Sequence, residues 1–307
     1  MKRIIFKKGE EGSLENLSRA IKNCWIDLEN PSDTEIEEIA RKYGIEKETL
    51  ADALDENEVP RITKEKRYIS IILRVVNRKG NKGSTTPLGI ILLKDCIITV
   101  HSQTLEILTN FFEDRIKFST AKRTKLLLKI IREIIAEFTR NLRCCEKKIR
   151  ELEKKFLKHA RNEDIVYLAS IKEDILDMQN AILENNKVFE AILKGHYLKL
   201  SKSEEEMMYD LLIDNRQCIT MASFFVKVAA NTQNTFEWII SNNFNILMKR
   251  LTSIAAILSL PVIISGLYGM NVSLPLQENA NAFWILLSIS LALSLTATAV
   301  FKAKGWI

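Results

Sequence analysis

The pattern of apolar and polar positions changes character along the chain. Up to about residue 118, short apolar runs rich in β-branched residues are separated by polar turns. Two of these runs, RYISIILRVV at 67–76 and LGIILLKDCIITVH at 88–101, predict strands. The segment between them, RKGNKGSTTP at 78–87, predicts a loop or hairpin connection.

Two amphipathic segments in the same part of the chain predict short helices. The segment DTEIEEIARKYG can be capped by Ser32 or Asp33, and Gly44 can end it. The segment KETLADALDEN predicts a second short helix directly after it. Together with the strands, these helices predict an α/β domain over residues 1–118, as part of an α+β fold.

Helix-breaking residues are almost missing from the middle of the chain. No proline lies between residues 87 and 261, and Gly195 is the only glycine between residues 89 and 266. Because proline and glycine interrupt helices most strongly, their absence predicts long helices. Two antiparallel helices are expected within residues 119–200, at about 122–158 and 164–193, with a turn at Gly195.

A third helix is expected to be much longer. Ser203 and Glu206 have the spacing of a capping box, and no obvious stop follows until the GMN segment. A helix over residues 203–270 is on the order of 100 Å long. Because an isolated helix of that length is unstable, we expect this stalk to be bundled with its neighbours or with copies of itself.

Two apolar segments at the end of the chain have the length of membrane spans. They cover about 246–268, within the long helix, and 282–301. At 1.5 Å per residue, each can cross roughly 30 Å of hydrocarbon. The linker at 271–281 has no Lys or Arg, whereas basic residues precede the first span and occupy the tail at 302–307. The positive-inside rule then predicts a multi-pass protein of the cell (inner) membrane, with both termini cytoplasmic and the linker outside.

Composition and motifs narrow the classes of function. The 307 residues carry a formal net charge of +6, but the lysines are interleaved with acids as on solvated helix faces, so no nucleic-acid partner is expected. The five cysteines include no CxxC pair and are interpreted as reduced thiols of a cytosolic domain. Without a GxGxxG, P-loop or GxSxG motif, and with only His101, His159 and His196 as histidines, an enzyme is not expected.

One side of the first span carries small or polar residues. Two adjacent lines along this helix hold Asn245, Thr252, Ser259 and Gly266, and then Met248, Ala255 and Val262. Small residues allow transmembrane helices to pack closely. The same pattern is also typical of a pore wall, where small polar groups meet water and ions. The spacing alone leaves both interpretations open.

The end of the first span carries a recognisable motif. YGMN, at 268–271, closes a proline-containing span and precedes a linker without Lys or Arg. With NILMKRLTSI at the start of the span, the strand segments of the first domain and the tail KAKGWI, it resembles the CorA family of magnesium channels over essentially the whole chain. One departure is the outer loop VSLPLQENANAFW, in which Glu278 is the only acid.

The resemblance implies a funnel-shaped homopentamer with a long-helix stalk and two carboxy-terminal transmembrane helices. Five copies of Asn271 are then expected to ring the outer mouth of the pore, although a helix C-cap is the alternative interpretation of this residue. The implied selectivity filter comprises Tyr268, Gly269, Met270 and Asn271. The implied pore lining comprises Asn245, Leu251, Thr252, Ser259, Val262 and Gly266.

The resemblance also implies regulation by cytoplasmic Mg²⁺ bound between subunits. Asp210 and Asp214 lie four residues apart on one helix face and could share a cation, although a solvated acidic face is the simpler interpretation. On the other side of that contact, the candidates are Asp52, Asp55 and Glu56. Mg²⁺ is thus expected both as transported and as regulatory ion, with Co²⁺ or Ni²⁺ as further ions.

Two other functions remain open from the sequence. A transporter of the same fold could move Zn²⁺, Co²⁺ or Ni²⁺, and Met248 and Met270 are the only soft groups on or near the pore line. A membrane-anchored sensor or scaffold would use the two spans as an anchor only. The lipid bilayer is a partner under each of these functions.

Overall fold

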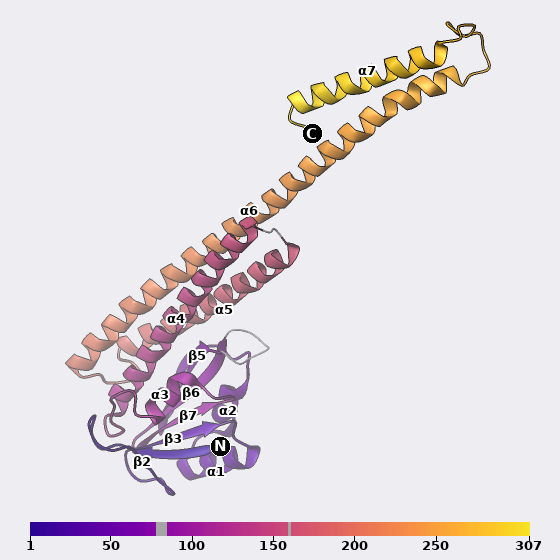
Figure 1. The fold of residues 1–307 in the computed structure, drawn as a ribbon. Helices are drawn as coiled ribbons and strands as arrows, with labels where there is room; N and C mark the ends of the chain where they lie inside the picture. Colours follow the sequence, from indigo (N-terminus) through magenta and orange to yellow (C-terminus); the bar gives the residue numbers. More distant parts are fainter. Residues whose placement is uncertain (78–84, 159–160) are drawn as a thin grey trace. The chain divides into compact units, whose positions relative to one another are not determined.

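The computed structural model describes residues 1–77, 85–158 and 161–307. Most of the connection expected at 78–87, and also His159, lie outside the described residues. The chain divides into two compact units, Met1–Gln233 and Asn234–Ile307. The first contains a β-sheet with its covering helices, and the second contains two long apolar helical segments (Figure 1).

A seven-stranded sheet forms the base of the first unit. Its strand order is β2-β1-β3-β7-β6-β5-β4, and every neighbouring pair is antiparallel except β3 and β7. The strands are β1 (Lys2–Phe6), β2 (Glu15–Asn16), β3 (Cys24–Glu29), β4 (Arg61–Lys64), β5 (Tyr68–Val76), β6 (Thr85–Leu93) and β7 (Cys96–His101).

The apolar run at 88–101 contains parts of two strands. Strands β6 and β7 turn back on one another at Lys94 and Asp95. Every described position of both strands is buried, so neither strand shows the alternation of a half-exposed strand. The turn also lacks the glycine or proline that normally marks one, which is why the sequence did not separate the two strands.

Short helices cover one face of this sheet. They are α1 (Asp33–Tyr43), α2 (Lys47–Ala51) and the 3₁₀ turn η1 (Asp52–Leu54), which pack with β3 and β7 around a common apolar core. The expected caps of α1 are confirmed. Ser32 accepts a hydrogen bond from the backbone of Glu35 in a capping box, and Gly44 ends the helix in the left-handed conformation.

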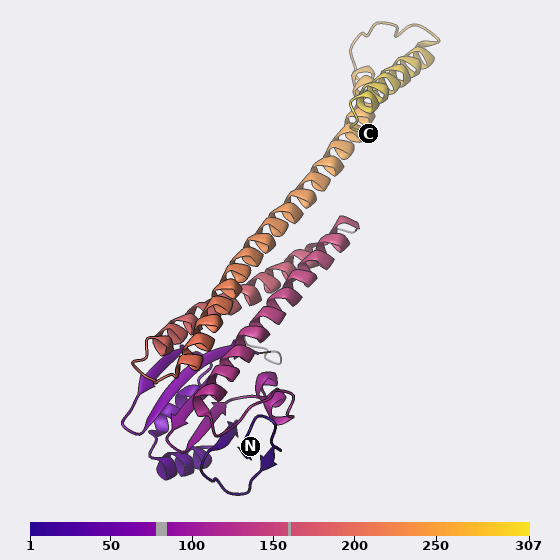
Figure 2. The ribbon, with the colours of Figure 1, turned by 90° about the vertical axis from the view of Figure 1, so that its left-hand side faces the viewer.

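Long helices pack against β5 on the sheet. They are α4 (Arg123–Lys158) and α5 (Asn162–Leu193), preceded by the short α3 (Glu106–Phe112). After the turn at Gly195, the first part of α6 (Lys202–Tyr268) returns alongside them (Figure 2). Thr232 donates a hydrogen bond to Glu153 of α4 at 2.6 Å, and Gln179 of α5 donates one to Ser223 at 2.8 Å. The long helix is therefore bundled with its neighbours, as expected.

The start of α6 corrects one expectation. The helix begins at Lys202, and the carboxylate of Glu204 accepts hydrogen bonds from the backbone amide and hydroxyl of Ser201, at 2.8 and 2.7 Å. The expected capping pair, Ser203 with Glu206, lies inside the helix instead. Both serine–glutamate pairs have the same spacing, so the sequence alone did not decide which serine lies outside the helix as its cap.

A buried ion pair joins the two parallel strands. The His101 ring faces two acceptors, because its Nδ1 lies 2.6 Å from the carbonyl oxygen of Gln103 and its Nε2 lies 3.0 Å from Oδ1 of Asp27. Burial by itself lowers the pKa of His101, but the hydrogen bond to Asp27 and the charges of Asp27 and Glu29 outweigh burial and leave the pKa raised. Because both nitrogens face acceptors, the protonated ring can donate a hydrogen bond from each of them.

We expect this pair to make the stability of the first unit fall as pH rises. A raised folded pKa gives stability that is fully present below the usual value of 6.5 and is lost as pH rises through the folded pKa. The thermal midpoint of the wild type should fall over that range. His101→Gln should be less stable at every pH but should lack that part of the pH dependence. If the thermal midpoints of the two proteins changed with pH in parallel, the assignment would be contradicted.

Candidate ion pathway and regulatory acids

The second unit holds two helices with the length and apolarity of membrane spans. They are the last part of α6 and α7 (Ala282–Ala303). Along α6, one set of residues is buried or half-buried at intervals of three and four residues, which is the pattern of a helix packed against a neighbour. This set is Ser253, Ala256, Ile257, Leu260, Pro261, Ile264 and Tyr268.

The expected pore-lining residues lie on other sides of the same helix. All six are exposed in the single chain: Asn245, Leu251, Thr252, Ser259, Val262 and Gly266. With 3.6 residues per turn, these positions lie away from the stripe that is covered within the chain, and of the six only Val262 also borders a cavity between α6 and α7. Apart from Val262, the line is therefore not used to pack α6 within its own chain, and it can face water or another subunit.

The GMN segment lies directly beyond the end of α6. The helix ends at Tyr268, and the amides of Gly269 and Met270 donate to the carbonyls of Gly266 and Leu267 at 3.3 and 3.4 Å. These bonds tighten the last turn. Asn271 is exposed and is not left-handed, and within the described residues its side-chain amide makes no hydrogen bond. This geometry does not support the C-cap interpretation of Asn271.

The two glycines of this segment are not required by the fold of one chain. A Cβ on Gly266 would meet no atom within 4 Å, and one on Gly269 would lie 3.4 Å from the carbonyl oxygen of Ser265, an ordinary contact. Neither glycine has a positive φ. Any need for a bare backbone at these positions therefore comes from outside the single chain.

Tyr268 lies on the side of α6 that faces α7. It lines a cavity of 420 Å³ together with Pro261 and Ser265 of α6 and Phe283 and Leu287 of α7. Met270 is exposed. Of the expected filter residues, Met270 and Asn271 therefore present free side chains at the end of the helix, whereas Tyr268 contributes to the contact between the two helices.

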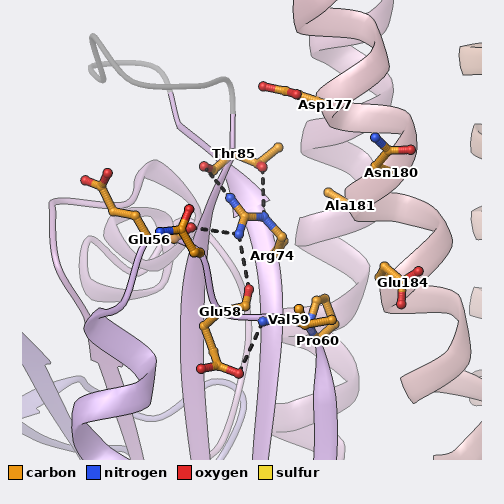
Figure 3. A pocket seen from close by; sticks show the side chains of 11 residues that line it. Glu56, Glu58, Val59, Pro60, Arg74, Thr85, Asp177, Asn180, Ala181 and Glu184 are labelled. Carbon is orange, nitrogen blue, oxygen red and sulfur yellow. Dashed lines mark hydrogen bonds between the residues drawn. The ribbon is translucent and has the colours of Figure 1, made fainter.

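The acids expected in the first domain have separate surroundings. Asp52 receives a hydrogen bond from Arg61 at 2.5 Å, and the Oδ1 of Asp55 accepts one from the backbone amide of Asn57 at 3.0 Å. Glu56 lines a cavity of 560 Å³ between the loop at residues 56–60 and α5 (Figure 3). Within the described residues, no group of three metal-ligating side chains forms in the single chain.

Arg74 organises the loop that carries Glu56. Its guanidinium donates to the carbonyl oxygens of Glu56 and Glu58 at 2.9 and 3.1 Å, and to the carbonyl of Thr85 at 2.9 Å (Figure 3). Burial lowers the pKa of Arg74 from its usual value. The cavity is also lined by Asp177 and Glu184 of α5, which sequence reasoning missed because no local pattern links them to a loop more than a hundred residues away.

The two acids expected on α6 are exposed. Within the part of the chain that the structure describes, neither Asp210 nor Asp214 has an ion-pair or hydrogen-bonding partner for its carboxylate. They border an exposed apolar stripe that contains Tyr209, Ile213 and Phe224, with exposed fractions of 60%, 40% and 58%. A shallow groove of 570 Å³ runs along this stripe past Thr220 and Met221.

These features are those of a membrane protein with two candidate spans at its carboxy-terminal end. A large domain of sheet and helices precedes the spans, and an asparagine with a free side chain follows the first of them. A model of the family described as "CorA-like Mg2+ transporter protein" matches residues 22–303. The chain belongs to this family, and the fold matches that of a complete CorA structure, as expected from the sequence.

Individual relatives extend this result. The chain is 28% identical to the cobalt/magnesium transport protein CorA of Methanocaldococcus jannaschii, over 92% of this chain and 91% of the relative. It is 20% identical to the protein of the same name from Thermotoga maritima, over 92% of this chain and 83% of that one. The complete structure of the CorA magnesium transporter from M. jannaschii matches 100% of this chain and 99% of its own, with a TM-score of 0.85 and 25% identity.

Proposed function

We propose that this chain is the subunit of a homopentameric channel for passive uptake of Mg²⁺. The observation that carries the proposal is the uncovered line of small and polar residues on α6 that ends at the free amide of Asn271. Membership of the CorA-like family and the names of the relatives support a divalent cation as the transported ion. Co²⁺ is a further candidate ion from those names, and Ni²⁺ stays a prediction.

The chemistry of Asn271 suits a hydrated magnesium ion. Mg²⁺ loses its water reluctantly and tends to keep several water ligands. A ring of amide oxygens accepts hydrogen bonds from that water without replacing it, whereas carboxylates at the same place would hold the ion more tightly. Conduction requires binding that is strong enough for entry and weak enough for exit. The proposed filter is therefore Asn271 with Gly269 and Met270, and Tyr268 supports it from the side of α7.

The proposed lining below the filter combines polar and apolar rings. Thr252, Ser259 and Asn245 offer hydroxyl and amide groups to hydrated ions, and Gly266 leaves room near the filter. Leu251 and Val262, with exposed fractions of 62% and 67%, are the candidates for apolar constrictions. Such constrictions can close a pore by excluding water.

We propose that cytoplasmic Mg²⁺ closes this channel by binding between subunits. Asp210 and Asp214 offer free carboxylates at the border of the apolar stripe on α6, and carboxylate oxygens are ligands that Mg²⁺ prefers. Glu56 is the best of the expected partners on a neighbouring subunit, because Asp52 and Asp55 already accept hydrogen bonds within their own chain.

We propose the inner membrane as the location, with the first unit in the cytoplasm. Lys249 and Arg250 on α6 and Lys302 and Lys304 after α7 are exposed, and the loop between the spans has no basic residue. The positive-inside rule then orients the start of the first span and the end of the second span toward the cytoplasm, with the linker outside.

Flux into liposomes tests the proposed function. The purified protein is reconstituted, and Mg²⁺ entry is followed with a trapped fluorescent indicator, with and without hexaamminecobalt(III), an inert mimic of hydrated Mg²⁺. We expect entry that the mimic blocks. Flux of Zn²⁺ without Mg²⁺ entry would favour the alternative of a transporter for softer ions, and no ion flux from a folded oligomer would favour the sensor or scaffold.

The exposed stripe on α6 predicts how the subunits meet. Phe224→Asp places a charge on this stripe, so we expect it to reduce the pentamer in favour of smaller species in native mass spectrometry. Val166→Asp is the matched control, because Val166 is 71% exposed on α5, away from the stripe. An unchanged oligomer with Phe224→Asp, or equal loss with the control, would contradict this interface.

A further inference from the structure

Two of the five cysteines face each other across the parallel strands of the sheet. Cys24 begins β3 and Cys96 begins β7, and the two residues are direct partners in the register. Paired residues of parallel strands project to the same face, and neighbouring strands lie about 4.8 Å apart. That separation falls within the Cα–Cα range of roughly 4.4–6.8 Å in which a disulfide can form.

The two thiols lie in the same buried environment. Their side chains belong to the apolar core under α1, with exposed fractions of 0% and 3%. The segment that leads into β3 contacts the pair at Ile21, which is 47% exposed and whose carbonyl oxygen accepts a hydrogen bond from the amide of Cys24 at 3.3 Å. Because Cys24 is fully buried, reaction with a solute requires this end of β3 to open.

The electrostatic surroundings divide the roles of the two thiols. The neighbouring thiol of Cys96 outweighs burial and lowers the pKa of Cys24, with help from nearby backbone groups and from the charge of Lys42. The same contact, together with burial, raises the pKa of Cys96. Since the thiolate is the nucleophile, Cys24 is the attacking sulfur and Cys96 the partner that follows.

The other buried cysteines lack this arrangement. Burial raises the pKa of Cys145 to about 11, and burial also raises the pKa of Cys218. Cys144 is exposed. These three cysteines therefore serve as internal controls for the reactivity of the pair.

We propose that Cys24 and Cys96 form an oxidisable thiol pair that takes up one disulfide bond by exchange with a low-molecular-weight disulfide such as oxidised glutathione. The Cys24 thiolate attacks one glutathione sulfur, the S–S bond of glutathione breaks, and the first glutathione leaves as a thiolate that takes up a proton. Cys96 then loses its proton to solvent, and its sulfur attacks the Cys24 sulfur and displaces the second glutathione. Two protein thiols are oxidised, and one disulfide is reduced to two thiols.

The bond would connect segments that are distant in the chain. It would fix β3, from the amino-terminal part of the sheet, to β7, which belongs to the antiparallel run of β4 to β7. Exchange with glutathione in the reverse direction would reduce the bond again, so the modification of the first unit is reversible.

Glutathione redox buffers applied to the full-length protein in detergent test the proposal. After quenching with an alkylating agent and digestion, we expect a cross-linked peptide pair containing Cys24 and Cys96 that has lost two hydrogens. Cys144 should carry at most a mixed disulfide. In urea the pair should need a more oxidising buffer, because unfolding removes the register. No cross-link in the folded protein, or an equal yield in urea, would overturn the proposal.

Variants provide a second measurement. In Cys96→Ser, the mixed disulfide on Cys24 cannot be resolved, so glutathione should accumulate there several-fold over wild type. Cys145→Ser is the matched control for a buried cysteine and should leave formation of the cross-link unchanged. If Cys24 stays unmodified in folded Cys96→Ser, the proposed attacking role of Cys24 is wrong.

Discussion

Asn271→Ala is expected to reduce Mg²⁺ entry into liposomes by about tenfold or more. Each hydrogen bond to the hydrated ion contributes about 1 kcal/mol, and about 1.4 kcal/mol corresponds to a factor of ten. In an oligomer one substitution removes the amide from every subunit, so the losses add around the ring. The free side chain of Asn271 at the end of α6 is the structural reason for this expectation.

The control for this result lies in the same loop. Asn281→Ala removes the same group from a residue whose side chain makes no capping hydrogen bond at the start of α7. We expect nearly wild-type flux from this variant and an unchanged oligomer from both. Wild-type flux and wild-type inhibition by hexaamminecobalt(III) in folded Asn271→Ala would show that the filter lies elsewhere.

The double substitution Asp210→Asn and Asp214→Asn is expected to remove inhibition by internal Mg²⁺. The two carboxylates are exposed and free of ion pairs within the described part of the chain, so the change should not disturb the fold of the subunit. Loss of the proposed ligands should raise the internal Mg²⁺ concentration needed for closure by about 5- to 150-fold, the usual range of coupling between sites. Flux measured against trapped Mg²⁺ checks this expectation.

A second acidic pair on the same helix, Glu205 and Glu206, distinguishes ligand loss from a general change of charge. Glu205→Gln with Glu206→Gln leaves the cap that Glu204 forms with Ser201 in place. We expect this control to keep wild-type closure. If the control and the double Asp variant shift closure equally, or neither does, the acids on α6 are not specific ligands.

Local signals in the sequence were enough for some elements. Helix α1 could be predicted with both of its caps, because Ser32, Glu35 and Gly44 act within a few residues of each helix end. The capping serine of α6 was predicted two residues late, at Ser203 instead of Ser201, because two serine–glutamate pairs have the same spacing there. The division of β6 from β7 was missed, because complete burial removes the alternation that marks strands.

For the candidate site, too, the sequence predicted only what local geometry determines. The line of small and polar residues on α6, spaced seven residues apart, could be predicted from the sequence, because helix geometry alone places those residues on one side. That α7 leaves most of this line uncovered depends on packing between the two helices, which only the structure shows. The acids proposed to regulate the channel are not brought together by one chain, so neither the sequence nor a single subunit can identify their partners.

The parallel contact of β3 with β7 has a consequence for biosynthesis. Strand β3 leaves the ribosome about seventy residues before β7, which completes its hydrogen bonds. One edge of β3 therefore stays unpaired while β4, β5 and β6 are synthesised. The antiparallel run from β4 to β7 can form early through local contacts, and the amino-terminal strands then add to its edge. The spans follow last, so this sheet can be complete before the apolar helices reach the translocation machinery. In a nascent chain stalled before residue 96, β3 could pair with β1 but would keep one open edge, so this chain is expected to be a substrate for chaperones.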